Sequence, residues 1–233
     1  MLELFPLAVA RVQLQPDPLD SARLFQQVLH WRGDFIGNPL EGCAWTGDLH
    51  GVHQVHRSPD VAWLLAQLRQ QVGKYLGDLG FKEGGLAVHI QRSWPVVSEP
   101  GQLVGRHHHP NAHISAVYHL NGDGSGRCGA LRLFNPMALN ELVPGMAVGS
   151  QGPLHPDARL NAAHHDIPAL AGQLLLFPAR LDHGVLENCS EEVRLSIAFD
   201  LVLSAPAGPC STEYLPPHPR LWDPLSQDGE LMP

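Results

Sequence analysis

From Gly85 onward the chain consists of short apolar or alternating runs separated by glycine, proline and asparagine. The runs are LAVHIQRSW, QLVGRHHH, HISAVYHL, ALRLFNP, QLLLFP and VRLSIAFDLVL. Segments of this length and pattern predict β-strands. Six of them at this spacing favour an antiparallel sandwich or barrel. We therefore expect a mainly β core over residues 85–203.

Two helical patterns precede this core. In the stretch from Pro59 to Leu79 the apolar residues fall on one stripe, Ser58 can cap the first turn, and Gly80 follows the end. A weaker pattern covers Pro18 to Trp31. Such stripes usually face a core, so they are assigned no chemistry. With 233 residues, we expect a single domain over 1–233: a helical N-terminal layer over 1–84, the β core over 85–203 and a proline-rich C-terminal tail over 204–233.

Composition excludes several classes of function. The formal charge of −8 argues against a partner that is a nucleic acid. The apolar opening is interrupted by Arg11, is too short to cross a membrane and lacks the basic start of a signal peptide, so a cytoplasmic location without membrane attachment is expected. The four cysteines include no C-x-x-C pair. The sequence therefore predicts neither a zinc ribbon nor a disulfide framework.

The stretch RHHHPNAH, residues 106–113, concentrates histidines. His107 and His109 are two residues apart, so on a strand they point to the same side. Imidazole suits iron, zinc, copper or nickel, and the ligand set needs a third member from elsewhere in the chain. His183 is the natural candidate, because it follows the apolar run QLLLFP. The alternative is a histidine-rich surface loop that binds no metal.

The run VRLSIAFDL predicts a strand with two different faces. Leu195, Ile197 and Phe199 would point one way, whereas Arg194 and Ser196 would point the other. An arginine that faces the interior needs an anion, since an unpaired buried charge is costly. Either a structural carboxylate, such as Asp200 or Glu187, or a bound dicarboxylate would satisfy it.

Three motifs in this order resemble a known family. They are H-x-H-P-N-A-x-x-S-A-V-Y-H-L, G-x-L-x-L-F-P-x-x-L-x-H-x-V and R-x-S-I-A-F. Together they are similar to the bacterial 2-oxoglutarate/Fe(II)-dependent oxygenases of the H-x-H-P-N-S type, over about Leu86 to Leu201. The resemblance implies a double-stranded β-helix, or jelly-roll, that uses Fe(II) as cofactor and 2-oxoglutarate as co-substrate. The N-terminal helices would then pack on one sheet.

The same resemblance implies roles for single residues. His183 resembles the distal iron ligand, Arg194 and Ser196 the partners of the distal carboxylate of 2-oxoglutarate, and Tyr118 a further hydrogen-bond donor to that carboxylate. The usual H-x-D or H-x-E of the superfamily is missing. Either His107 and His109 supply two imidazoles, which we prefer because a neutral amide is a poor iron ligand, or Asn111 takes the place of His107.

Other features remain outside this ligand set. The pair His164-x-Asp166 is the H-x-D of the chain, but it lies where the family has no ligand, and we interpret it as a loop feature or a pocket wall. The long stretch from Met137 to Ala169 is the expected lid or specificity element.

The predicted function is an oxygenase that hydroxylates a C–H bond of a small-molecule or peptide substrate and releases succinate and CO₂. Two alternatives have the same ligands. One is a three-histidine thiol dioxygenase, which would bind iron without 2-oxoglutarate. The other is a non-catalytic jelly-roll whose metal, zinc for example, is structural. The R-x-S pair favours the first function, and neither the substrate nor the oligomeric state can be read from the sequence.

Overall fold

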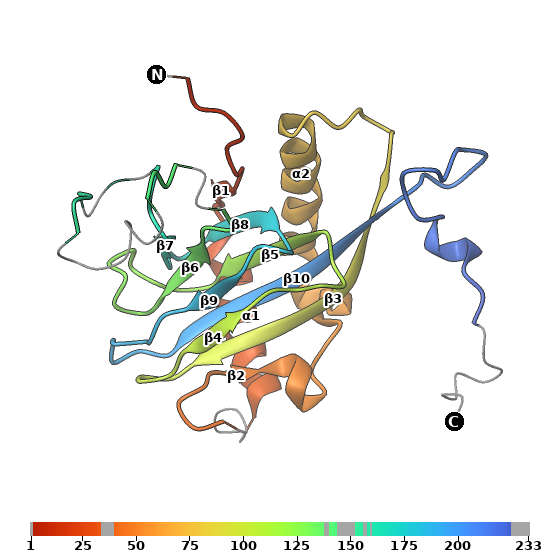
Figure 1. The fold of residues 1–233 in the computed structure, drawn as a ribbon. Helices are drawn as coiled ribbons and strands as arrows, with labels where there is room; N and C mark the ends of the chain where they lie inside the picture. The colour runs from red at the N-terminus through yellow and green to blue at the C-terminus, as the bar shows by residue number, and fades with distance from the viewer. Residues whose placement is uncertain are drawn as a thin grey trace, which may run out of the picture.

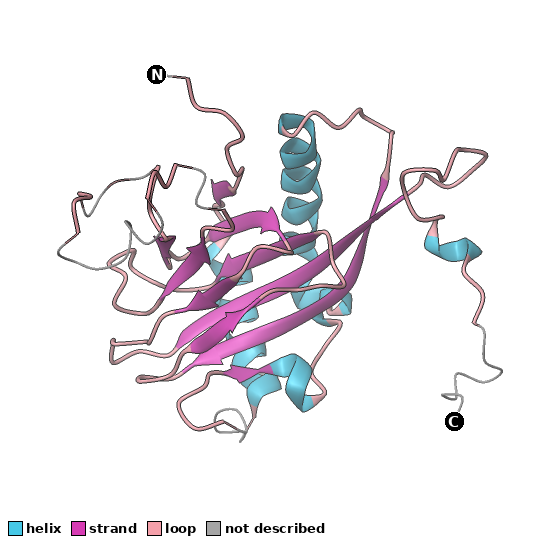
Figure 2. Cartoon of the chain, in the orientation of Figure 1, coloured by secondary structure: helices cyan, strands magenta, loops and turns pink. Residues whose placement is uncertain are grey.

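A computed structural model describes residues 2–33, 40–137, 140–143, 152–155, 158 and 160–224. Most of its regular structure is β, arranged in two sheets (Figures 1 and 2). The strands are β1 (Ala10–Gln13), β2 (Trp45–Thr46), β3 (Ala87–Ser98), β4 (Val104–His107), β5 (Ile114–His119), β6 (Ala130–Phe134), β7 (His164–Pro168), β8 (Gln173–Pro178), β9 (His183–Val185) and β10 (Arg194–Ser204). Each of the six predicted runs corresponds to one of these strands.

The strand order is that of a jelly-roll. The larger sheet has the order β1-β8-β5-β10-β3-β2, and the smaller one has the order β4-β9-β6-β7. All pairings within the sheets are antiparallel. The prediction of a mainly β jelly-roll is therefore confirmed. The N-terminal part is not purely helical, however, because β1 and β2 extend the larger sheet at its two edges.

Both predicted helices are present. They are α1 (Pro18–Arg32) and α2 (Ala62–Asp78), and α2 continues a 3-10 turn, η3 (Pro59–Val61). The Asp17 side chain caps α1 by accepting the Leu19 N–H at 2.8 Å, and Ser58 accepts the Asp60 N–H at 3.3 Å. Gly80, whose φ is 88°, follows α2 and suits the left-handed turn there. Three further 3-10 turns are η1 (Gly47–His50), η2 (Val55–Arg57) and η4 (Pro219–Leu221).

The larger sheet separates two apolar regions. On one face, α1 and α2 contribute Leu24, Val28 and Leu64 to a core shared with β5, β8 and β10, and Figure 1 shows both helices behind this sheet. On the other face, Leu175 and Phe177 of β8 pack against β6 and β7 of the smaller sheet. The cavity described below lies on this second face. No helix of the described residues is both long and apolar enough to cross a membrane.

Candidate metal centre

Three histidines meet on neighbouring elements of the smaller sheet. His107 ends β4 and lies directly opposite His183, which begins β9. Their ring centroids are 4.3 Å apart. His109 follows β4 by two residues, and its backbone N–H bonds to the Ala179 carbonyl at 2.9 Å. One ring nitrogen from each of the three lies within 4.8 Å of the others. The structure thus brings together the three histidines predicted as ligands.

Each of the three rings uses its Nδ1 for a hydrogen bond to an oxygen. His107 bonds to the Gly105 carbonyl at 2.7 Å, His183 to the Leu181 carbonyl at 2.8 Å, and His109 to the Asp200 carboxylate at 2.5 Å. Since those oxygens only accept, each Nδ1 carries the proton. The Nε2 of each ring therefore has a free lone pair, which is the state that a metal ligand needs.

Burial favours the neutral form of two of these rings, His183 and His107. His183 is 4% exposed and His109 is 8% exposed. Burial, with a smaller contribution from neighbouring His107, lowers the pKa of His183 to about 3. Burial is also the main cause that lowers the pKa of His107. Neutral imidazoles with free lone pairs fit a transition metal, so the donor set suits Fe(II) and equally other divalent ions of this kind.

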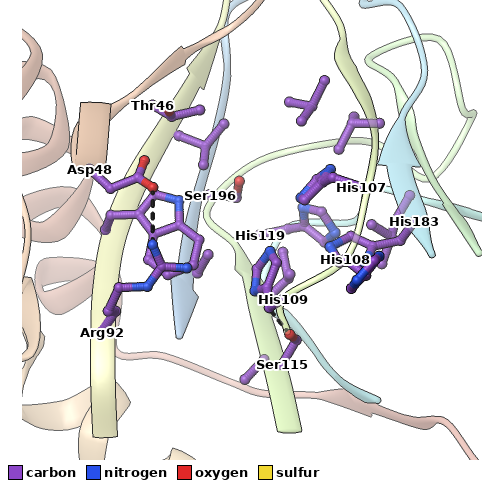
Figure 3. A pocket seen from close by; sticks show the side chains of 18 of the residues that line it. Thr46, Asp48, Arg92, His107, His108, His109, Ser115, His119, His183 and Ser196 are labelled. Atoms are coloured by element: carbon purple, nitrogen blue, oxygen red, sulfur yellow. Dashed lines mark hydrogen bonds and ion pairs between the residues drawn. The ribbon is translucent and has the colours of Figure 1, made fainter. Parts of the chain in front are cut away.

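A cavity of about 320 Å³ opens beside the three histidines. Figure 3 shows His107, His109 and His183 on one side of it and Arg92 with Asp48 on the opposite side. Arg92 Nη1 and Asp48 Oδ2 are 3.6 Å apart. The remaining lining residues come mainly from both sheets: Thr46, Leu49, Trp94, Val96, Val104, His108, Ser115, Ala116, Val117, His119, Leu131, Val185, Arg194, Ser196 and Ala198.

Arg194 lines this cavity and has no anionic partner within the described part of the chain. It is 1% exposed, and its Nε and Nη2 atoms are buried without a hydrogen-bond partner. Burial lowers the pKa of Arg194 to about 10, so the group remains charged at neutral pH. Neither structural carboxylate considered from the sequence neutralises it. Asp200 bonds to Arg92 and His109 instead, and Glu187 is exposed at the surface.

Tyr118 lies on the face of β5 that points away from the cavity. Tyr118 belongs to the core on the helical side, where its ring lies edge-on to Trp63. The next residue, His119, lines the cavity and is the cross-strand partner of Ser196. Both ring nitrogens of His119 are buried and lack a partner among the described residues. Burial and the charge of Arg194 lower the pKa of His119 to about 3. The position of Tyr118 thus argues against its predicted role, and sequence reasoning missed His119.

Other predicted features lie away from the three histidines. Asn111 is exposed in the turn after His109 and does not line the cavity. His164 and Asp166 lie on β7, an edge strand, and Asp166 pairs with Arg132. Described parts of the stretch 137–169, His164 included, line a second cavity of about 920 Å³ together with residues 2–7. The rest of the expected lid lies largely outside the described residues.

Fold and cavity together define a class: jelly-roll proteins with a cluster of histidines beside a buried arginine. Residues 92–200 match the model of a family described as "Putative 2OG-Fe(II) oxygenase". This match confirms, over that stretch, the family expected from the three motifs. A comparison of the sequence with curated proteins gives no match.

Solved structures share the fold at low sequence identity. The α-ketoglutarate-dependent carbocyclase SnoK from nogalamycin biosynthesis superposes with a TM-score of 0.58 at 14% identity, covering 87% of this chain and 83% of SnoK. The epimerase SnoN, in complex with Fe³⁺, α-ketoglutarate and nogalamycin RO, gives 0.56 at 13% identity, covering 95% and 92%. A prolyl-4-hydroxylase from Pseudomonas putida gives 0.52 at 19% identity, covering 83% and 92%. These structures show the shared fold, and the family match over residues 92–200 indicates a 2-oxoglutarate- and Fe(II)-dependent oxygenase.

Proposed function

We propose that His107, His109 and His183 hold one Fe(II) ion and that Arg194, Ser196 and His119 bind the distal carboxylate of 2-oxoglutarate. The observation that carries this proposal is the presence, in one cavity, of three rings with free Nε2 lone pairs and a buried guanidinium that has no anionic partner among the described residues. A bound carboxylate would neutralise Arg194 and give its buried N–H groups an acceptor.

The residues of the chain would then orient and isolate the reactants. A guanidinium and a hydroxyl at one end of a dicarboxylate leave its other end free to reach the histidines. Trp94, Val96 and Ala198 form apolar walls that exclude water from the same cavity. Fe(II) and 2-oxoglutarate, when bound, supply the oxidising chemistry that inserts oxygen into a C–H bond and releases succinate and CO₂.

The substrate in this proposal is a small molecule or the side chain of a peptide. Thr46, Asp48 and Arg92 provide polar groups across the cavity from the histidines (Figure 3). A cavity of about 320 Å³ is at the lower end of the range for small-molecule sites. The similar carbocyclase and epimerase, named for nogalamycin biosynthesis, support a small-molecule substrate.

An anaerobic titration of Fe(II)-loaded protein with 2-oxoglutarate tests the proposal. The expected result is a visible metal-to-ligand charge-transfer band that saturates with 2-oxoglutarate. The variant Arg194→Ala should need a higher concentration for saturation, and His183→Ala should show no band. Arg132→Ala is the matched control, because Arg132 pairs with Asp166 on the edge strand and lies outside the cavity lining.

Two outcomes would overturn the assignment in different ways. Protein that holds iron and develops no band would exclude 2-oxoglutarate and leave the three-histidine thiol dioxygenase as the better reading. Protein that binds no iron under anaerobic conditions would exclude the metal centre itself.

A further inference from the structure

Within the part of the chain that the structure describes, the three-histidine cluster contains no carboxylate of its own. Among the described residues, the group that could hold a metal comprises His107, His109 and His183 alone. Three neutral imidazoles leave the double charge of a divalent ion uncompensated by its protein ligands. A carboxylate that contacts one of the three rings could compensate part of that charge.

Asp200 makes that contact from behind one ligand. Its Oδ1 lies 2.5 Å from His109 Nδ1, and its side chain is fully buried. Ser115 Oγ lies 3.2 Å from the same ring nitrogen. Among the described residues, the partners of the His107 and His183 Nδ1 atoms are backbone carbonyls. The cluster is thus asymmetric, with one ring bonded to a carboxylate and two rings bonded to neutral acceptors.

Arg92 holds this carboxylate in place. Its Nε and Nη2 donate to Asp200 Oδ2 at 3.0 and 2.6 Å, which leaves Oδ1 for His109. Asp200 continues the face of β10 that carries Arg194, Ser196 and Ala198, so the same strand lines the cavity and contacts His109.

We infer that Asp200 is a positioning residue of the metal centre: it fixes His109 with the proton on Nδ1 and supplies, through that ring, the negative charge that the ligand set lacks. This inference rests on the proposed function, since it requires a metal at the three histidines. A carboxylate behind a ligating imidazole makes the imidazole a stronger donor and fixes its orientation.

The variant Asp200→Asn tests the inference because an amide cannot replace the carboxylate here. Both neighbours, Arg92 and His109, donate hydrogen bonds, and an amide presents one oxygen and one NH₂ group. If the oxygen faces Arg92, the NH₂ group faces His109 Nδ1 and favours the tautomer with the proton on Nε2. The ring then has no free lone pair for the metal.

Titration of metal-free protein with Co(II), followed by its visible ligand-field absorption, measures the effect without requiring activity or 2-oxoglutarate. Asp200→Asn should weaken Co(II) binding by about 10- to 100-fold, the range known for lost partners of ligating histidines. Asp182→Asn is the charge control, because it removes a carboxylate next to His183 that bonds to Arg106 and His108 and not to a ligand. Asp166→Asn is the fold control, and both controls should bind Co(II) like the wild type.

The variant Arg92→Gln separates positioning from general support of the fold. It removes the ion pair that holds Asp200 but keeps the carboxylate and its bond to His109, so Co(II) binding should weaken by less than in Asp200→Asn. An equal or larger loss in Arg92→Gln would mean that the buried ion pair, and not the bond to His109, supports the site, which would overturn the inference. An Asp200→Asn protein that is folded by circular dichroism and binds Co(II) normally would also overturn it.

A measurement on the wild-type protein does not depend on any variant folding. Heteronuclear NMR of histidine rings in Zn(II)-loaded protein should show His109 protonated at Nδ1, with its proton furthest downfield of the three ligands. A His109 ring protonated at Nε2 would contradict the inference. Wild-type protein that binds neither Co(II) nor Zn(II) would instead remove the proposed metal centre, so the two failures are distinguishable.

Discussion

His119 and Tyr118 are adjacent residues whose side chains face opposite sides of β5. Tyr118 is in the helical core and His119 is in the cavity beside Arg194. If His119 helps to bind the distal carboxylate, His119→Leu should weaken 2-oxoglutarate binding by roughly tenfold, the effect of losing a hydrogen bond to a charged group. Tyr118→Phe should leave this affinity unchanged. Anaerobic titrations of the charge-transfer band measure both, and equal losses in the two variants would contradict the assignment.

His107 and Asn111 are the two candidates for the remaining ligand position. His107 lies 4.3 Å from His183 between ring centroids, whereas Asn111 is exposed in the turn beyond His109. His107→Ala should therefore abolish tight binding of Fe(II) or Co(II), and Asn111→Ala should bind either metal like the wild type. Metal content after gel filtration under anaerobic conditions compares the two. Retention of metal by His107→Ala would return Asn111 to the ligand set.

At the scale of an element, β10 performs two tasks on its two faces. Leu195, Ile197 and Phe199 fill the helical core, while Arg194 and Ser196 line the cavity. Ile197 is fully buried, so Ile197→Ala should lower the free energy of unfolding by about 2–5 kcal/mol. Because its side chain points away from the cavity, Co(II) affinity measured well below the melting temperature should be retained. A selective loss of metal binding without a loss of stability would show that the faces are not independent.

The same strand shows what the sequence can predict and where it stops. Alternation placed Arg194 and Ser196 on one face, and the structure agrees because a buried strand has a period of two. Asp200 lies on that face too, but six residues span roughly 20 Å along a strand, too far for a direct pair with Arg194. The partner of Asp200 is His109, and this contact depends on how β5 and the turn after β4 lie beside β10. That arrangement is set by long-range pairing, which the sequence of a single strand does not contain.

Short strands and strand register explain further differences between the sequence-based expectations and the structure. The strands β2 and β9 have only two and three residues, so no periodicity could reveal them. The prediction for Tyr118 also depends on register: Ser196 lies opposite His119, and this register places His119, not Tyr118, on the cavity side of β5. The grouping of the three histidines was predictable because His107 and His109 share a face of one strand and His183 follows another apolar strand.

At the scale of the whole molecule, buried neutral histidines make the stability of the metal-free protein depend on pH. The pKa of His119 falls from an ordinary value of 6.5 to about 3 on folding, mainly because of burial. Between these values the unfolded chain binds a proton that the folded protein excludes, so acid favours unfolding. His183 shifts in the same direction and to a similar value. Stability should therefore be constant above about pH 7 and decrease as the pH falls below 6.5.

The variant His119→Leu removes one of the two groups responsible for this pH dependence. Removing a single group that titrates only in the unfolded state should reduce the slope of unfolding free energy against pH by at most about 1.4 kcal/mol per pH unit. Denaturant unfolding of chelator-treated protein between pH 4 and pH 7, compared with wild type, measures the two slopes. Leucine also changes packing, which shifts the whole curve, so only the slopes are informative. Parallel curves would mean that His119 gains its proton in the folded state as easily as in the unfolded chain, and that its ring is solvated beside Arg194.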